Sequence, residues 1–151
     1  MSTVTITADE KFTAETPLLI VGAGAAGLCA ALAAKEAGVD AVLIERDAVP
    51  AGSTALSAGL IPAAGTRFQR AKGIADDPRI FAADIRRKAY GEADPVVVDA
   101  VAKGSGLLVE WLADRYGLPF GVVENFNYPG HSALRMHGLP TRCPFRKFHP
   151  V

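Results

Sequence analysis

Three glycines near the start of the chain have the spacing of a phosphate-binding turn. Gly22, Gly24 and Gly27 form the pattern G-x-G-x-x-G within the stretch LLIVGAGAAGLCAALAA. In such a turn the first glycine permits a tight bend, the second lets the backbone approach a pyrophosphate, and the third lets a helix pack closely on a strand. The free N–H groups at the start of that helix favour an anion. The pattern therefore predicts a dinucleotide site that also includes the turn residues Ala25 and Ala26.

The glycines interrupt an uncharged run that has two other interpretations, a membrane segment and a secretion signal. A membrane-spanning helix needs about 20 apolar residues, and residues 16–34 nearly reach that length. A signal peptide would begin with basic residues, whereas the preceding TADEKFTAET is polar and mixed in sign. Residues 18–21 suit a buried strand, and good helix formers follow from Ala25 onward. We therefore expect a strand, a glycine turn and a helix, and no transmembrane segment.

An acidic residue follows the second apolar run. In DAVLIERD the run 41–44 leads into Glu45, 18 residues beyond Gly27, and we expect a strand over 41–45. An acid at this distance can accept hydrogen bonds from an adenosine ribose hydroxyl; the alternative is a surface glutamate. Arg46 could indicate a 2′-phosphate and therefore NADP, but the adjacent acid would repel that phosphate. We count both residues as predicted cofactor contacts, and the glycine pattern leaves FAD and NAD open.

The next segment distinguishes these two cofactors. Residues 51–69, AGSTALSAGLIPAAGTRFQ, could form a flexible loop, but their apolar content favours a buried segment. The order GAGAAG, IER, GSTALSAG resembles the fumarate reductase/succinate dehydrogenase flavoprotein family and its 3-ketosteroid dehydrogenase relatives. Members of that family carry a glycine motif, a strand-ending glutamate and then a G-[GNS]-[ST]-x-x-[AS]-[AG]-G segment along the pyrophosphate and the isoalloxazine ring.

The resemblance implies FAD as the cofactor. The phosphates would lie near Gly52, Ser53 and Thr54. The reactive edge of the ring would lie near the backbone of Ser57, Ala58 and Gly59. Small residues are needed there because a larger side chain would clash with the planar ring.

The resemblance also implies an α/β fold, an incomplete Rossmann-like FAD/NAD(P)-binding domain of the GR2 type. We expect an N-terminal extension over 1–16, the N-terminal part of the FAD-binding domain over 17–142, and an atypical tail over 143–151. A third parallel strand is predicted over 120–126. Because family members are much longer, we expect a truncated product that has no turnover by itself.

Two aspartate–proline pairs predict helix starts, with the aspartate as the cap and the proline in the first turn. These pairs are Asp77-Pro78 and Asp94-Pro95. Gly104 and Gly106 predict a break, so we expect two helices, over 95–103 and 106–116. The expected core residues of these helices are Val98, Val101, Leu108, Trp111 and Leu112. The basic run 86–88 is expected on a solvated helix face.

A cluster of histidines and arginines lies in NYPGHSALRMHGLPTR. Its members are His131, Arg135, His137 and Arg142. The resemblance implies a loop near the flavin, where cations could hold carboxylates or stabilise reduced flavin. The alternative is a polar interdomain loop. The first three residues are the candidates for a catalytic or substrate-binding role.

Composition limits the other classes of function. The 16 basic and 16 acidic residues balance, which gives no global attraction to nucleic acid. Cys29 and Cys143 lie far apart and match no metal or redox spacing, so no metal site is predicted. Cys29 is expected as a buried thiol in a reducing, cytoplasmic compartment.

These patterns predict the FAD-binding portion of a flavin-dependent oxidoreductase that acts on a C–C bond next to a carbonyl or carboxylate. The predicted partners are FAD, a small-molecule substrate of the parent enzyme, and either a second copy or a complementing chain. Two alternatives remain, a fragment of an NAD-linked dehydrogenase and a non-catalytic nucleotide-binding module.

Overall fold

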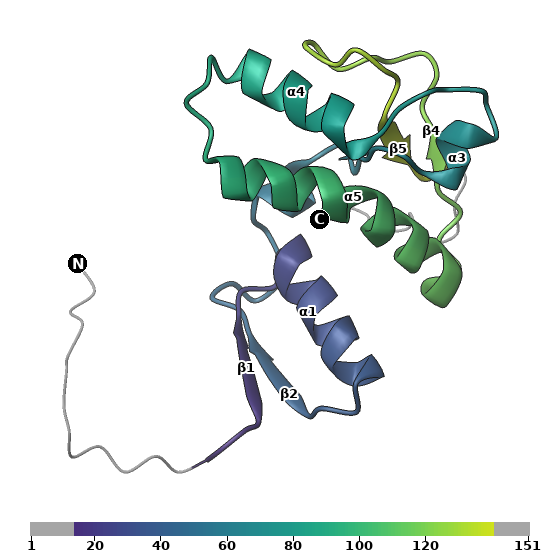
Figure 1. Ribbon diagram of the computed structural model, residues 1–151. Helices are drawn as coiled ribbons and strands as arrows, with labels where there is room; N and C mark the ends of the chain where they lie inside the picture. The colour runs from purple at the N-terminus through teal and green to yellow at the C-terminus, as the bar shows by residue number, and fades with distance from the viewer. Residues whose placement is uncertain (1–13, 141–151) are drawn as a thin grey trace. The chain divides into compact units, whose positions relative to one another are not determined.

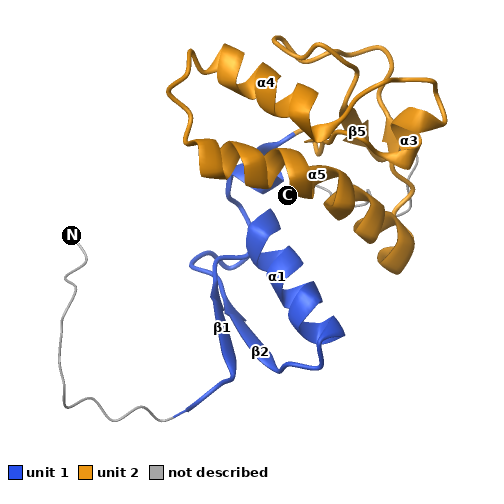
Figure 2. Ribbon diagram, in the orientation of Figure 1, with its two compact units in different colours: residues 1–57 blue, residues 58–151 orange. Residues whose placement is uncertain are grey.

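A computed structural model of the protein describes residues 14–140 of the 151-residue chain. The chain divides into two compact units, residues 1–57 and residues 58–151, coloured blue and orange in Figure 2. The first unit contains the glycine turn, and the second contains His131, Arg135 and His137. Arg142, the fourth member of that cluster, lies outside the described residues.

The first unit is a strand–helix–strand motif. Strand β1 (Leu18–Val21), helix α1 (Ala25–Glu36) and strand β2 (Ala41–Ile44) follow one another in the chain. The strands pair in parallel, with Leu18 opposite Ala41, and α1 lies along them (Figure 1). The predicted strand, glycine turn and helix are confirmed, and the second strand ends one residue before Glu45. A short helix, α2 (Ser53–Leu56), completes the unit.

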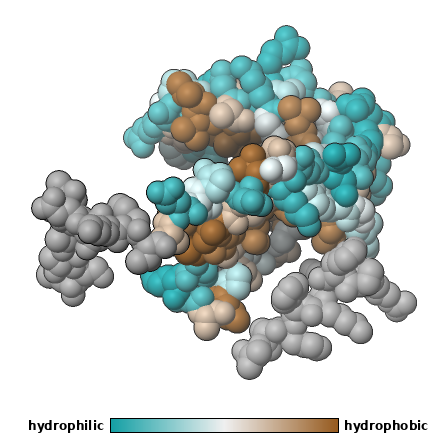
Figure 3. All heavy atoms as spheres, turned by 90° about the horizontal axis from the view of Figure 1, so that it is seen from below, coloured by the Kyte–Doolittle hydropathy of each residue, from teal (hydrophilic) through white to brown (hydrophobic). Residues whose placement is uncertain are grey.

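Several apolar side chains of this small sheet are exposed. They are Leu19, Val21, Val42 and Ile44, with Val21 76% exposed. Hydrophobic side chains, brown in Figure 3, reach the surface of the molecule. Parallel sheets are normally covered on both faces, so the exposure of these side chains is unusual for a parallel pair.

The second unit combines three helices with a small antiparallel sheet. The helices are α3 (Arg67–Arg70), α4 (Pro78–Lys88) and α5 (Pro95–Tyr116). The strands are β3 (Ile61–Pro62), β4 (Gly121–Val122) and β5 (Met136–Gly138), in the spatial order β3-β5-β4. Helices α4 and α5 pack on each other (Figure 1) around a core of Ala64, Phe81, Ala82, Val98 and Ala102.

Both predicted helix caps are confirmed. The Asp77 carboxylate accepts hydrogen bonds from the backbone amides of Arg79 and Ile80, at 2.6 and 3.1 Å. The Asp94 carboxylate accepts from the amide of Val96 at 2.8 Å. A proline occupies the first turn of each helix. Because the first-turn amides have no acceptor within the helix, each aspartate fixes where its helix begins.

The prediction of two helices over 95–116 is wrong, because α5 continues through both glycines. Gly106 is buried, and a Cβ there would lie 2.5 Å from the carbonyl oxygen of Ala64. This glycine permits a close approach between the helix and the segment before α3. The continuous helix also sets its buried face, which consists of Val98, Ala102, Ser105, Gly106, Val109 and Leu112. Val101 is 47% exposed, so its predicted core position is wrong.

The predicted parallel strand over 120–126 is also corrected. Only Gly121 and Val122 form a strand, β4, which runs antiparallel to β5. Its partner strand β5 lies in the segment that was predicted to form a loop with histidines and arginines. Val122 is buried, as is Phe120, the residue just before the strand.

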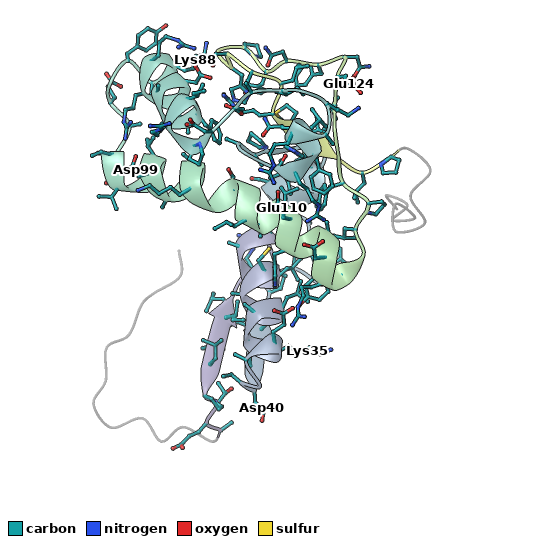
Figure 4. All side chains as sticks on the ribbon, turned by 45° about the vertical axis from the view of Figure 1, so that its right-hand side comes forward. Lys35, Asp40, Lys88, Asp99, Glu110 and Glu124 are labelled. Atoms are coloured by element: carbon teal, nitrogen blue, oxygen red, sulfur yellow. The ribbon has the colours of Figure 1, made fainter. Side chains whose placement is uncertain are left out.

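Charged side chains of the second unit pair across its helices. The basic run 86–88 of α4 is exposed, as predicted, and Arg86 lies 2.6 Å from the carboxylate of Asp99 on α5. Glu110 of α5 accepts a hydrogen bond from the backbone amide of Arg67 at 2.5 Å. Asp99 and Glu110 are labelled on their helix in Figure 4. These contacts join α5 to α4 and to the start of α3.

We expect opposite effects from adding a methyl group at the two glycines of α5. Gly106→Ala should lower the free energy of unfolding by about 1–3 kcal/mol, because the added Cβ meets backbone at 2.5 Å. Gly104 has open space around it, so Gly104→Ala should raise stability by up to about 1 kcal/mol through helix propensity. Thermal or urea unfolding of both variants measures the difference. Equal effects would contradict the close approach of α5 to Ala64.

Candidate dinucleotide-binding site

Two glycines shape the turn between β1 and α1. Gly22 has a φ of +101°, in the region that favours glycine, and its amide donates to the carbonyl oxygen of Ile44 at 2.7 Å. A Cβ on Gly27 would lie 2.0 Å from the carbonyl oxygen of Gly22. The turn and the helix can therefore pack together only because both residues are glycines.

Gly24 differs from these two, because the protein itself leaves room for a Cβ atom there. Its φ of −73° and ψ of 178° suit any residue. An added Cβ would meet only the hydroxyl oxygen of Thr54, at an ordinary contact distance of 3.6 Å. The fold therefore does not require glycine at this position. A group that binds close to the backbone would require it, and the predicted pyrophosphate is such a group.

The first turn of α1 is accessible to an anion. Gly24 is the N-cap residue and has no side chain that could cap the helix. It is exposed together with Ala25 and Ala26, and no acidic residue lies in the first turn. The positive end of the helix dipole is therefore exposed and can attract a negatively charged ligand.

The 52–57 segment lies against this helix start. The Thr54 hydroxyl accepts a hydrogen bond from the Ala25 amide at 3.1 Å, and the Ser57 hydroxyl donates to the Thr54 carbonyl oxygen at 2.9 Å. The glycine turn and the 52–57 segment are therefore in contact, through residues that are 29 positions apart in the chain. The Thr54 hydroxyl proton is not used by the Ala25 bond, since the oxygen accepts in that contact.

Glu45 is held at the end of β2 by backbone amides. Its carboxylate accepts from the amide of Ala23 at 2.7 Å, of Arg46 at 2.8 Å and of Asp47 at 3.2 Å. The Ala23 and Asp47 amides lower the pKa of Glu45 below its usual value, so the group is ionised at neutral pH. A carboxylate has about four acceptor positions, so capacity remains for a ribose hydroxyl.

The other predicted contacts of this site are exposed. Arg46 lies 3.4 Å from the carboxylate of its neighbour Asp47. Gly52 is the N-cap residue of α2 and Ser53 is the first residue of that helix. Ala58 and Gly59 begin the second unit, and Gly59 has a φ of +70°. The structure gives these positions and tests no cofactor contact, so their roles stay predictions.

Arg135 is fully buried within the second unit. Its guanidinium lies 2.8 Å from the carboxylate of Asp76 and 2.6 Å from that of Asp84, and it stacks over the ring of Phe81. Burial alone would raise the pKa of Asp84, but bonds from Ser132 and Arg135 hold it well below the usual range. This cation therefore compensates two buried acids.

His137 is also fully buried. Its Nδ1 lies 2.9 Å from the carbonyl oxygen of Arg135, and its Nε2 lies 2.8 Å from the Thr66 hydroxyl oxygen. Burial lowers the pKa of this imidazole, so it is neutral at pH 7. A carbonyl oxygen can only accept, so Nδ1 carries the proton and Nε2 accepts from Thr66. Neither His137 nor Arg135 has an exposed atom that could bind a substrate directly.

His131 is partly exposed and lies at the side of a small hollow. The hollow has a volume of about 260 Å³ and lies between the C-terminal half of α4 and residues 128–131. The imidazole packs edge-on against Phe81, with the ring centroids 5.6 Å apart. Its Nδ1 is buried without a hydrogen-bond partner in the described part of the chain. A role for His131 near the flavin or substrate stays a prediction.

Sequence reasoning did not predict the partners of Arg135 and His137. Asp76, Asp84, Thr66 and Gln69 form the polar surroundings of these two side chains. Thr66 and Gln69 make a capping box at the start of α3, and the T-x-x-Q pattern could have indicated it. Asp84 lies one turn after Phe81 on the buried face of α4, a position that could have suggested a buried acid.

Residues 14–140 contain neither a metal-binding cluster nor a membrane-spanning helix. No group of three histidine, cysteine or acidic side chains there is arranged to hold a metal ion. No helix in that range is both long enough and apolar enough to cross a membrane. Cys29, expected as a buried thiol, is partly buried, and burial raises the pKa of its thiol.

A parallel strand–helix–strand unit with a glycine turn, an open helix start and an acid after the second strand defines a dinucleotide-binding protein. The model of the FAD binding domain family matches residues 18–142. The chain therefore belongs to the FAD binding domain family, and its cofactor is FAD. The glycine turn alone left FAD and NAD open as cofactors, and the family match identifies FAD.

Known relatives share this part of the chain. Urocanate reductase of Eggerthella lenta is 35% identical over 128 residues, which are 85% of this chain and 21% of that protein. The fumarate reductase (cytochrome) of Shewanella frigidimarina is 35% identical over 63% of this chain and 17% of its own length. The predicted resemblance to fumarate reductase flavoproteins is confirmed, and the chain spans about a fifth of the length of these relatives.

Two solved structures are similar to the fold. The open conformation of a flavocytochrome c3 fumarate reductase matches with a TM-score of 0.71 and 33% identity over 81% of this chain and 21% of that chain. The 3-ketosteroid-delta4-(5alpha)-dehydrogenase of Rhodococcus jostii RHA1, in complex with 4-androstene-3,17-dione, matches with a TM-score of 0.62 and 30% identity. That match covers 71% of this chain and 22% of the dehydrogenase. The expected 3-ketosteroid dehydrogenase relatives are therefore found.

Proposed function

We propose that the chain is the FAD-binding portion of an oxidoreductase that acts on a C–C bond next to a carbonyl or carboxylate. Urocanate and fumarate, named in the reductases that resemble the chain, carry carboxylates, and the steroid named in the dehydrogenase structure carries ketones. When bound, FAD supplies two-electron transfer, while the protein supplies binding, orientation and electrostatics.

The main observation that supports the proposal is the hydrogen bond between Thr54 and the start of α1. This contact sets a hydroxyl beside the open first turn of the helix, next to a glycine that the fold itself does not require. We assign the pyrophosphate to this place. The contacts assigned to it are the backbone at Gly22, Gly24, Ala25, Ala26 and Gly27 and the residues Gly52, Ser53 and Thr54.

Glu45 is proposed to bind the adenosine ribose, with Arg46 beside it. The carboxylate is fixed by three backbone amides and is ionised, which makes it a strong acceptor for a hydroxyl group. The backbone of Ser57, Ala58 and Gly59 is proposed to lie near the reactive edge of the flavin ring, and His131 near the flavin or substrate. The small side chains of Ser57 and Ala58, and the absence of one at Gly59, leave space for a planar ring.

The finer fold class, an incomplete Rossmann-like domain of the GR2 type, belongs to this proposal and is supported by the parallel pair β1–β2 around α1. The exposed apolar residues of that sheet support a covering partner, either a second copy or a complementing chain. We also propose a reducing, cytoplasmic compartment, supported by the thiol of Cys29.

A spectrum of the purified chain tests the proposal. After incubation with FAD and gel filtration, the protein fraction should absorb in the visible region as bound flavin. A parallel incubation with NAD should leave no bound nucleotide. Retention of NAD in place of FAD would favour the NAD-linked alternative, and flavin binding without turnover in any longer version would favour the non-catalytic module.

We expect Glu45→Ala to weaken FAD binding roughly tenfold or more, because a charge-assisted hydrogen bond to the ribose is lost. Asp40→Ala is the matched control, since it removes another exposed acid of the same unit. The dissociation constant of each variant is measured by flavin fluorescence titration. An unchanged constant for Glu45→Ala would return this residue to its alternative role as a surface glutamate.

A further inference from the structure

The residues that follow Gly59 are held by one short strand, β5. Ile61 and Pro62 of β3 pair with His137 and Met136 of β5. One residue further on, the amide of Ala63 donates to the carbonyl oxygen of Arg135 at 2.8 Å. The backbone that leaves Gly59 therefore has a hydrogen-bonded partner strand almost from its start.

Close packing joins the same two segments at Leu60. A Cβ on Gly138, the last residue of β5, would lie 2.7 Å from Cδ2 of Leu60 and 3.4 Å from Cγ2 of Val123. Leu60 thus occupies the space that a side chain at position 138 would need, and its Cδ2, the end of a flexible side chain, would have to turn aside to admit one. Since Leu60 is bonded directly to Gly59, this contact acts on the residue next to the proposed flavin-edge segment.

A buried polar network fixes the far end of the segment. The Thr66 hydroxyl lies 2.8 Å from Nε2 of His137 and accepts from the Gln69 amide at 3.1 Å. The Gln69 side-chain amide donates to the carboxylate of Asp76 at 2.8 Å and to the Leu134 carbonyl oxygen at 2.9 Å. Thr66, Gln69 and His137 are all 0% exposed. A buried network whose members are all paired specifies one arrangement of the chain.

Arg135 anchors β5 to the rest of the second unit. Its two bonds to Asp76, at 2.9 and 2.8 Å, involve Nε and Nη2, and Nη1 bonds Asp84 of α4 at 2.6 Å. Because an unpaired buried charge is costly, this planar cation holds the strand in one place relative to α4. The strand that supports residues 60–66 is therefore itself fixed.

We propose that Arg135–Gly138 is a positioning element for the flavin-edge segment Ser57–Gly59. It acts through Leu60 and Thr66 and touches neither cofactor nor substrate. The inference rests on the proposed placement of Ser57, Ala58 and Gly59 beside the flavin. Functional groups keep a productive geometry when packing and hydrogen bonds lock the residues that support them, and Gly138 and His137 supply one contact of each kind.

Two glycine variants in the same small sheet test the packing contact. Gly138→Ala crowds Leu60, whereas Gly121→Ala, on the paired strand β4, adds a methyl group into open space. In the full chain with FAD, Gly138→Ala should weaken FAD binding about fivefold and change the shape of the visible flavin band. Gly121→Ala should leave both unchanged. Circular dichroism at the assay temperature checks that both variants are folded.

Two variants of Thr66 test the polar contact. Thr66→Ser keeps the hydroxyl, and Thr66→Val keeps the shape but loses the bond to His137. The valine variant should shift the midpoint potential and the absorbance band of the bound flavin, and the serine variant should restore both. A merely structural role would lower the melting temperature of Thr66→Val without moving these flavin properties in the folded protein.

The outcomes separate this inference from the proposed function. If wild-type chain binds FAD but Gly138→Ala and the folded Thr66→Val bind it with unchanged affinity, spectrum and potential, the positioning role is overturned. If Thr66→Val does not fold, the pair of glycine variants decides by itself. If wild-type chain retains no FAD, the proposed binding site fails first, and the positioning role fails with it.

Discussion

Gly24→Val should abolish flavin retention while the protein stays folded. The fold leaves room for a Cβ at this position, since the nearest atom is the Thr54 hydroxyl oxygen at 3.6 Å. Valine is a poor N-cap residue, which costs about 1 kcal/mol of stability. A branched side chain would, however, occupy the space through which the pyrophosphate approaches the backbone. We expect FAD affinity to fall by about 100-fold or more, measured as flavin absorbance after gel filtration and by titration.

The contrast with Gly27 makes this experiment selective. A Cβ at Gly27 would lie 2.0 Å from the Gly22 carbonyl oxygen, so Gly27→Ala should lower the melting temperature as well as FAD binding. Gly24→Val should lose FAD binding while its melting temperature falls by only a few degrees, as a loss of about 1 kcal/mol implies. A Gly24→Val protein that purifies with a full flavin complement would show that the glycine turn is not the pyrophosphate site.

Arg135→Met should strongly destabilise the second unit. The substitution leaves the buried carboxylate of Asp76 without its cation and leaves Asp84 paired only with Arg87. Breaking a buried ion pair in this way costs about 3–5 kcal/mol. Urea unfolding followed by circular dichroism measures the loss. Arg79→Met is the matched control, since its side chain is 92% exposed and caps no buried charge.

A triple variant separates the loss of a cation from the loss of packing. Arg135→Met combined with Asp76→Asn and Asp84→Asn removes the uncompensated charges and should recover part of the stability. If Arg135→Met alone unfolds at the wild-type urea concentration, the guanidinium of Arg135 does not stabilise the buried carboxylates, and the account of β5 as a fixed strand is wrong.

The sequence predicted the features whose causes are local. Asp77 and Asp94 cap their helices through amides two and three residues away, so the residue types alone indicate where each helix begins. The strand, turn and helix around Gly22 likewise depend on neighbouring residues, since φ at a turn and helix propensity are properties of short segments. The resemblance of GAGAAG, IER and GSTALSAG to a flavoprotein family added the cofactor, which the family match then supported.

Glu45 shows how far such local reasoning extends. Its place after β2 could be predicted from the apolar run before it, and an acid at that distance from the glycines suggested a ribose contact. Its bond to the Ala23 amide, 22 residues earlier, follows only from the parallel pairing of β1 and β2. That bond makes the difference between an exposed acid and one held in a fixed position.

Only the tertiary structure decided the meaning of Gly106, Arg135 and His137. From the sequence, Gly106 was predicted to break a helix, yet α5 continues through it. Ala64, 42 residues earlier, lies against the helix at that point, where a larger residue would not fit. Arg135 and His137 read as polar candidates for a substrate site, yet their partners Asp76, Asp84 and Thr66 lie 51 to 71 residues away. The type of a charged or polar residue determines which hydrogen bonds and ion pairs it can form. Burial and long-range pairing determine whether its partners are other protein groups or a ligand.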